Sequence, residues 1–169
     1  MTQTQSKSLK QHALESMTFA HGYVQKLTKD IPDAKALYQS CPMDNHVLWT
    51  LGHLATTYGW FAILLDAKAN AGIPETWNAL FGMDSKPSPD ASKYPSIAEV
   101  RAKFESSFAV VVKLFEATPE SQMNDATATD GYGFCSSKVD VALKCAWHDG
   151  YHVGQIASLR KPMGVAKSK

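Results

Sequence analysis

Two histidines, His148 and His152, stand four residues apart in the C-terminal stretch CAWHDGYHVGQIASLR. An α-helix turns about 100° per residue, so their side chains would lie about 40° apart on one face. Two imidazoles in this arrangement can bind one metal ion. The alternative is that both are ordinary core histidines, which need polar partners because an unpaired buried polar group costs about 1–3 kcal/mol.

The pair also resembles the H-E-x-x-H motif of zinc proteases, with Asp149 in place of the glutamate. In those enzymes the acidic residue is the general base. Aspartate is one methylene shorter than glutamate, and Asp149 would point about 100° away from His148. No His, Asp or Glu follows His152. We therefore expect no protease site, and a third ligand must come from earlier in the chain.

His53 is the best candidate for this third ligand. It lies in the apolar run LWTLGHLATTYGWF, where a buried imidazole requires a polar partner. His46 precedes it by two turns, or about 10.8 Å, so the two cannot bind one ion without distortion. Capping or solvent exposure at the start of a helix explains His46. His21 lies on or near the inner stripe of the first helix and is the reserve candidate, whereas His12 is expected at the surface.

The best set of metal ligands is therefore His53, His148 and His152. Three neutral imidazoles leave one or more coordination positions open, as catalytic sites do. All-nitrogen ligation suits a divalent metal such as zinc, nickel or iron, and the sequence does not choose among them. Cys145, one turn before His148, could be a fourth ligand, although a buried cysteine more often packs as a small hydrophobic residue.

The remainder of the chain predicts the helices that position these side chains. Apolar residues recur every three or four positions in four segments, at about 8–30, 44–69, 96–117 and 138–161. Helix caps are predicted at Asp44 or Asn45, at Ser96 and at Ser137. The second segment is apolar nearly all round, which predicts that it is buried or packs against a partner subunit.

Two long connections separate these segments, at about 70–95 and 118–137. The first contains a stretch around Trp77 that could form a short helix. Four helices with two long connections predict an all-α four-helix bundle with long crossover connections. The length of 169 residues is that of one domain, which we expect to span residues 1–169.

Composition excludes several classes of protein. The net charge of +1 gives no electrostatic reason to expect nucleic acid or an anionic membrane as a partner. The three cysteines are widely spaced and form no C-x-x-C motif, so reduced thiols are expected rather than a disulfide framework. The N-terminus lacks the apolar core of a signal peptide, and no run of about 18 apolar residues occurs. We expect a soluble, cytoplasmic protein.

Two motifs give the sequence a family resemblance. The run W-x-x-G-H-L spans Trp49 to Leu54, and the run H-x-x-x-H-x-G-Q-I-x-x-L-R spans His148 to Arg160. Together with the order of four long helices, they resemble the DinB/YfiT-like superfamily over nearly the whole chain. The resemblance implies a four-helix bundle, usually dimeric, with a divalent metal held by three histidines. Carried onto this sequence, those are again His53, His148 and His152.

The resemblance also shapes the functional expectation. Members with known roles include thiol-dependent transferases and isomerases, so we expect a metal-dependent enzyme of the thiol-dependent transferase or hydrolase type, acting on a small-molecule or thiol substrate as a homodimer. The alternative is a non-catalytic, metal-binding dimeric bundle with a structural, storage or stress-sensing role. Trp49, Tyr58 and Trp60 are expected in the core or a dimer interface. The loop 118–137 and the Trp77 region match no family motif, so the sequence does not name a substrate.

Overall fold

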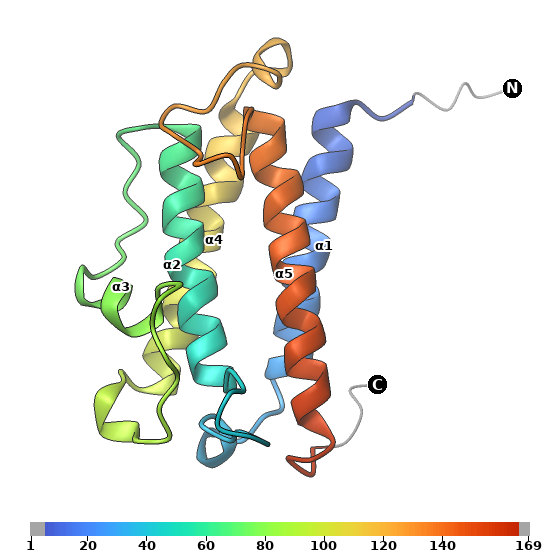
Figure 1. Ribbon diagram of the computed structural model, residues 1–169. Helices are drawn as coiled ribbons and strands as arrows, with labels where there is room; N and C mark the ends of the chain where they lie inside the picture. Colours follow the sequence, from blue (N-terminus) through green and yellow to red (C-terminus); the bar gives the residue numbers. More distant parts are fainter. Residues whose placement is uncertain (1–5, 166–169) are drawn as a thin grey trace, which may run out of the picture.

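The computed structural model describes residues 6–165, which form an all-α bundle (Figure 1). Within this range there are five α-helices: α1 Leu9–Thr28, α2 Val47–Leu65, α3 Thr76–Phe81, α4 Ile97–Ala117 and α5 Lys138–Arg160. The connections contain three short 3-10 turns, at Asp33–Lys35, Ala91–Lys93 and Glu120–Gln122. The four long helices begin and end within a few residues of the predicted segments, and α3 is the short helix expected around Trp77.

Helix caps account for where most of the long helices begin. The predicted caps at Ser96 and Ser137 are confirmed, because each hydroxyl accepts the backbone N–H three residues later, at 3.2 and 3.3 Å. Ser8 and Gln11 form a reciprocal capping box at the start of α1. These side chains satisfy backbone N–H groups that have no partner within the first turn of a helix.

The cap predicted for α2 at Asp44 or Asn45 is wrong. His46 caps the helix, since its Nδ1 accepts the backbone N–H of Trp49 at 3.0 Å. The Asp44 carboxylate instead accepts two backbone N–H groups of the preceding turn, at 2.9 and 3.0 Å. The capping role considered for His46 is therefore the one it has, although the residue is fully buried.

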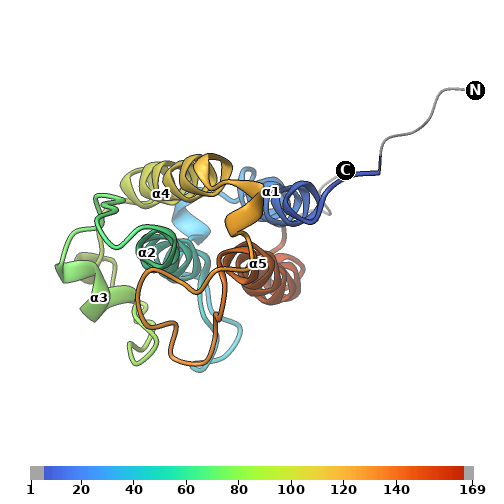
Figure 2. The ribbon, with the colours of Figure 1, turned by 90° about the horizontal axis from the view of Figure 1, so that it is seen from above.

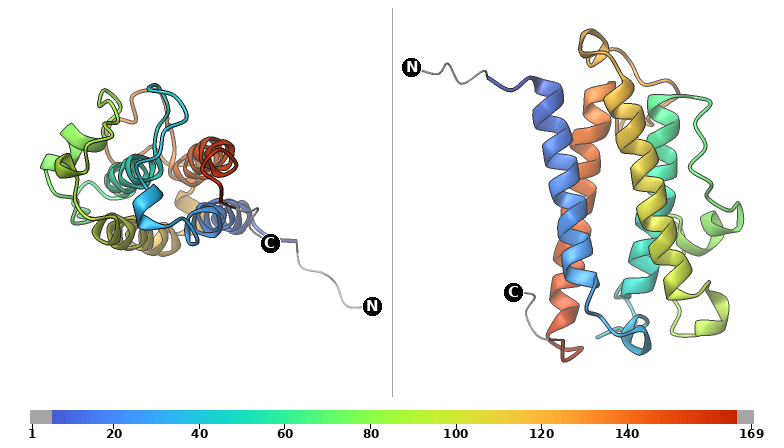
Figure 3. Two further views of the ribbon diagram at one scale, coloured as in Figure 1. Left: turned by 90° about the horizontal axis from the view of Figure 1, so that it is seen from below. Right: turned by 180° about the vertical axis from the view of Figure 1, so that it is seen from behind.

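The four long helices form two layers of two. α2 and α5 lie side by side in one layer, and α4 and α1 form the layer behind them (Figures 1 and 2). Seen from behind, α1 covers α5 and α4 covers α2 (Figure 3). α1 and α5 run in one direction, and α2 and α4 run in the other (Figure 1). The connection from α2 to α4 therefore crosses the length of the bundle, and it carries α3 along the outer side of α2.

α2 is buried on almost its whole circumference, by α4, α5, α3 and the connecting segments (Figure 2). Trp49 and Tyr58, expected in the core or an interface, are buried within the chain itself, and Trp60 is half-buried. The loop 118–137 lies across the end of α2, where the N–H of Ala128 donates to the carbonyl of Leu64 at 2.7 Å. Among the described residues, no helix combines the length and apolar character needed to cross a membrane.

Candidate metal centre

The three histidines singled out by the sequence meet between α2 and α5. His148 Nε2 lies 3.2 Å from His53 Nε2 and 3.3 Å from His152 Nε2. One nitrogen of each ring lies within 4.8 Å of the others. Among residues 6–165, these three histidines form the cluster whose side chains are close enough to bind one metal ion. His53 and His152 are buried, whereas His148 is half-buried and connects the group to the surface.

His53 is held in place by contacts on both sides of its ring. Its Nδ1–H donates to the backbone carbonyl of Phe81, at the end of α3, over 2.8 Å. The Trp49 indole stacks on the imidazole, with 4.8 Å between ring centroids and an 8° angle between the planes. Because a carbonyl can only accept, this bond places the hydrogen on Nδ1 and leaves a lone pair on Nε2.

Gly52 allows α3 to come close enough to make that bond. A Cβ at Gly52 would lie 2.4 Å from the Phe81 ring, closer than any real contact. The Phe81 ring and the neighbouring Trp77 are buried against α2 and pack edge-on, 5.0 Å apart. The Trp77 region, which the sequence left without a role, therefore orients a histidine of the candidate centre.

His152 is oriented in the same manner by its own helix. Its Nδ1 lies 2.8 Å from Gln155 Oε1, an acceptor, so the hydrogen again resides on Nδ1 and Nε2 presents a lone pair. Outer partners of this kind fix the tautomer and the ring orientation of metal-binding histidines. Gln155, the glutamine of the motif that spans His148 to Arg160, therefore has a defined contact with the centre.

The three rings cannot satisfy one another's hydrogen-bonding groups, and His148 shows why. Its Nδ1 is buried and has no hydrogen-bond partner among the described residues. If its hydrogen is on Nε2, it can serve only one of the two neighbouring lone pairs. If the hydrogen is on Nδ1, three lone pairs converge and that hydrogen has no acceptor. A cation between the three Nε2 atoms removes this conflict, so the donor set fits a metal ion.

Burial keeps all three imidazoles in the neutral form that metal binding requires. Desolvation, followed by the neighbouring His152 and His53, lowers the pKa of His148 to about 3. Desolvation and His53 lower the pKa of His152 to about 4, against the opposing effect of the hydrogen bond that His152 donates to Gln155. The pKa of His53 is also lowered by burial.

The other sequence candidates lie outside this group. His12 is at the surface, as expected. Cys145, considered as a fourth ligand, is fully buried, and burial followed by the nearby Asp149 raises the pKa of its thiol. The reserve ligand, His21, faces a different set of partners. Its Nδ1 lies 3.1 Å from the Tyr58 hydroxyl, and its ring stacks on Phe108 with 3.7 Å between centroids.

Asp149 is the polar residue that sequence reasoning missed. It does point away from His148, but that direction is the bundle interior, where it is fully buried. Tyr58 donates its hydroxyl hydrogen to Asp149 Oδ2 over 2.8 Å, and His21 Nε2 lies 3.2 Å from Glu105 Oε2 at the far side. Asp149, Tyr58, His21 and Glu105 form a polar chain that connects α5, α2, α1 and α4. Burial raises the pKa of Asp149 to about 8, opposed by the bond from Tyr58.

A signal for this chain was present in the sequence. The buried stripe of α5 contains Ala142, Cys145, His152 and Ile156, and Asp149 falls in that same three- and four-residue spacing. The sequence places His148 and His152 on one face, and the structure places His152 within the buried stripe and His148 at its edge. An acidic residue within a buried stripe requires a polar partner, and the tyrosine on α2 supplies it.

Comparisons with known proteins agree with this geometry. A model of the DinB superfamily matches residues 17–156. The chain belongs to the DinB superfamily. A crystal structure of a conserved protein from Enterococcus faecalis has the same fold, with a TM-score of 0.65 over 92% of this chain and 97% of that chain. The two sequences are 15% identical, so the likeness extends to the fold alone. The comparison with curated proteins finds no match.

The structure gives most residues of the two DinB-like motifs a physical role. Besides the histidines and the residues that orient them, the motifs contain Ile156, which is fully buried in the core. Arg160 donates two hydrogen bonds to the Asp30 carboxylate, at 2.6 and 2.8 Å, and a third to the carbonyl of Leu27. These bonds join the end of α5 to the end of α1. A Cβ at Gly154 would contact nothing within 4 Å, so packing does not explain that glycine.

Proposed function

We propose that this DinB protein binds one divalent metal ion through His53, His148 and His152. The observation that supports the proposal is the pattern of hydrogen bonds around the three rings. Two Nδ1–H groups are engaged by Phe81 and Gln155, so their Nε2 lone pairs point at a third imidazole that can satisfy only one of them. Zinc, nickel and iron(II) all suit three imidazole ligands.

The metal content of purified protein tests this proposal. Protein prepared without chelators or a polyhistidine tag should contain close to one equivalent of metal per chain by elemental analysis. His148→Ala should lose that metal, because two imidazoles remain. His12→Ala, which removes an exposed histidine, is the matched control and should retain it. An unchanged metal content in His148→Ala would rule out the centre.

We further propose that the centre serves a metal-dependent enzyme of the thiol-dependent transferase or hydrolase type. A metal ion held by three neutral imidazoles supplies an open coordination position and Lewis acidity, which lowers the pKa of a bound thiol or water. The protein contributes the fixed tautomers of His53 and His152 and a half-buried His148 that leaves the group accessible from the surface. The preference for thiol transfer rests on family analogy.

Two simple reactions test for catalysis. Metal-free protein is reloaded with zinc, nickel or iron(II), then assayed with p-nitrophenyl acetate for hydrolysis and with a small thiol plus 1-chloro-2,4-dinitrobenzene for transfer. We expect turnover above the uncatalysed rate with at least one metal, and its loss in His148→Ala. Rates at background for every metal and both probes would contradict this class of activity.

One observation favours the alternative of a non-catalytic metal-binding bundle. His53 and His152 are only 7% and 3% exposed, as in a closed structural site. A structural metal stabilises the folded state in proportion to its binding free energy. Removal of a structural metal should therefore lower the melting temperature sharply, whereas removal of a catalytic metal should abolish turnover with a smaller thermal shift.

A further inference from the structure

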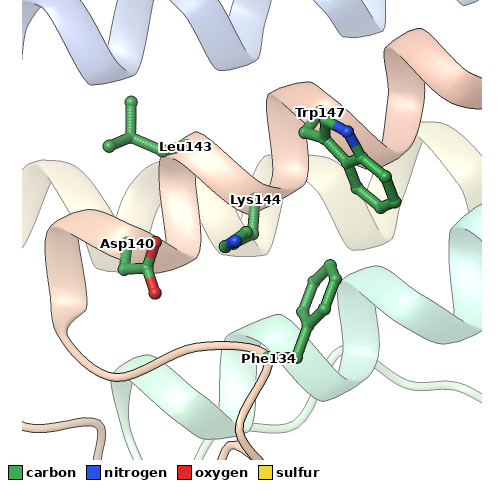
Figure 4. Close-up of a pocket in the computed structure, with 5 residues that line it drawn as sticks. All are labelled: Phe134, Asp140, Leu143, Lys144 and Trp147. Carbon is green, nitrogen blue, oxygen red and sulfur yellow. The ribbon is translucent and has the colours of Figure 1, made fainter.

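A hollow of about 360 Å³ opens on the surface between the N-terminal half of α5 and the loop 118–137. It is lined by Asp140, Leu143, Lys144 and Trp147 of α5 and by Phe134 of the loop 118–137. Figure 4 shows Phe134 rising from the loop toward Trp147, with Lys144 between these rings and Asp140. A volume near 300–1,000 Å³ is typical of small-molecule sites.

The loop is shaped to place Phe134 in this position. The two residues before it have positive φ angles, 50° at Tyr132 and 72° at Gly133, a conformation that is uncommon for a residue with a side chain. A Cβ at Gly131 would lie 2.0 Å from the carbonyl oxygen of Cys135, so only glycine fits there. Cys135, the residue after Phe134, is buried in the core.

Ring contacts connect the hollow to the candidate metal centre. The centroid of the Phe134 ring lies 5.9 Å from that of Trp147 and 6.4 Å from that of Phe61. The Phe61 ring in turn is edge-on to the imidazole of His148, with 6.4 Å between the centroids. Trp147 also precedes His148 directly in the chain. A molecule seated against Phe134 and Trp147 would therefore be connected to His148 through the rings of Phe134 and Phe61.

The hollow has one cation among its apolar surfaces. Lys144 Nζ lies 5.5 Å from the centroid of the Phe134 ring. Lys144 forms no hydrogen bond or ion pair within residues 6–165, so its charge is available to a ligand. Asp140, the other charged residue of the hollow, is engaged at Oδ2, which accepts the backbone N–H of Ser136 at 3.0 Å.

We propose that this hollow is a binding subsite for a planar apolar molecule that carries a carboxylate, of which an aromatic carboxylic acid is the simplest. The rings of Phe134 and Trp147 contact the planar group, and the Lys144 ammonium pairs with the carboxylate. The proposal rests on the proposed function in one respect: the reacting part of such a substrate would lie at the histidine centre, and the hollow would bind the remainder.

Binding of phenylacetate and phenylacetamide to metal-free protein tests the subsite, since the two probes have the same shape and differ in charge. The indole N–H signal of Trp147, assigned with Trp147→Phe, reports binding by NMR. We expect phenylacetate to bind about fivefold more tightly, the upper range for one exposed ion pair. Lys144→Gln should remove that preference and leave phenylacetamide binding unchanged. Trp147→Ala, which removes that signal and is followed through the resonances of the probe itself, should weaken both probes.

Lys113→Gln is the matched control, because it removes one exposed lysine from α4, outside the hollow. It should retain the preference for phenylacetate. Equal binding of the two probes, the same loss in both lysine variants, or no saturable shift of the Trp147 signal would each overturn the subsite. The experiment uses metal-free protein, so a negative result would overturn the subsite and leave the proposed metal centre standing. Failure of the proposed metal centre would likewise not change the binding measured here.

Discussion

Individual residues of the centre are held by partners that sequence spacing does not reveal. The spacing of His148 and His152, and the unusual position of His53 in an apolar run, sufficed to predict the three residues that meet. The carbonyl that holds His53 belongs to Phe81, 28 residues away, in a segment with no recognisable motif. Such a bond depends on how a connection folds back onto its neighbour, which residue types alone do not encode.

His46 gives a prediction at the same scale, because it is a buried, uncharged cap. Burial lowers its pKa to about 4 from the usual 6.5. Between these values the unfolded chain binds a proton that the native state excludes, so the free energy of unfolding should fall as the pH drops from about 6.5 toward 4. The slope from this one group is at most about 1.4 kcal/mol per pH unit.

His46→Asn tests that slope. Asparagine also caps helices but does not titrate, so urea unfolding of the metal-free variant at pH 7, 6, 5 and 4.5 should show a shallower pH dependence. The variant should be less stable at pH 7, because the His46 contact with the Ser88 carbonyl is lost. His12→Asn should keep the wild-type slope. A slope unchanged in His46→Asn would show that His46 titrates normally.

At the scale of elements, the hydrophobic pattern predicted the long helices well. It predicted less well which residues of a helix are buried, which residue caps it and where a short helix forms. Periodicity reports which face of a helix is buried, but the buried stripe of α5 passes through Asp149 and leaves His148 at its edge, so the face of the histidine pair does not mark the centre of the stripe. The caps predicted at Ser96 and Ser137 are confirmed, whereas α2 is capped by His46, for which capping was one of two explanations, and not by the predicted Asp44 or Asn45. Short helices such as α3 are set by tertiary packing, because six residues are too few to be stable alone.

The packing of α3 on α2 predicts the effect of one added methyl group. Gly52→Ala would place a Cβ 2.4 Å from the Phe81 ring, and it should displace α3 and release His53 Nδ1. We expect a loss of about 1–3 kcal/mol in the free energy of unfolding, with weaker metal binding measured by competition with a chelator.

Gly22→Ala supplies the matched control for that substitution. Gly22 also lies within a long helix, α1, but a Cβ there would meet nothing within 4 Å. Alanine should stabilise this position by about 0.5–1 kcal/mol, since glycine loses more conformational entropy in a helix. If Gly52→Ala were equally stabilising and bound metal normally, α3 would have no part in orienting His53.

The whole molecule is tied together by polar contacts that cross the bundle as well as by its apolar core. Arg160 and Asp30 join α5 to α1 at one end, and the chain of Asp149, Tyr58, His21 and Glu105 passes through the interior. The homodimer expected from the family resemblance stays a prediction. Trp49, once considered for its interface, is buried in its own chain and stacks on His53.

Tyr58 is the central link of the interior chain, and Tyr58→Phe removes one hydroxyl group while keeping the ring. The change would leave Asp149 buried without its donor and His21 without a partner at Nδ1, while the packing of the ring against Phe104 and Phe108 remains. A buried polar group that loses its only partner destabilises the folded state by about 1–3 kcal/mol. Asp149 lies on α5 between His148 and His152, and its partner Tyr58 lies on α2. Loss of this hydrogen bond should therefore also loosen the position of α5 against α2 and weaken metal binding.

Urea unfolding of metal-free protein measures the first effect, and chelator competition measures the second. Tyr132→Phe is the matched control, because that side chain is 80% exposed and its loss of a hydroxyl should change neither quantity. A Tyr58→Phe protein as stable as this control would mean that the interior chain contributes nothing to the bundle. Normal metal affinity alongside reduced stability would separate the chain from the centre, and assign the alignment of α2 and α5 to their apolar contacts instead.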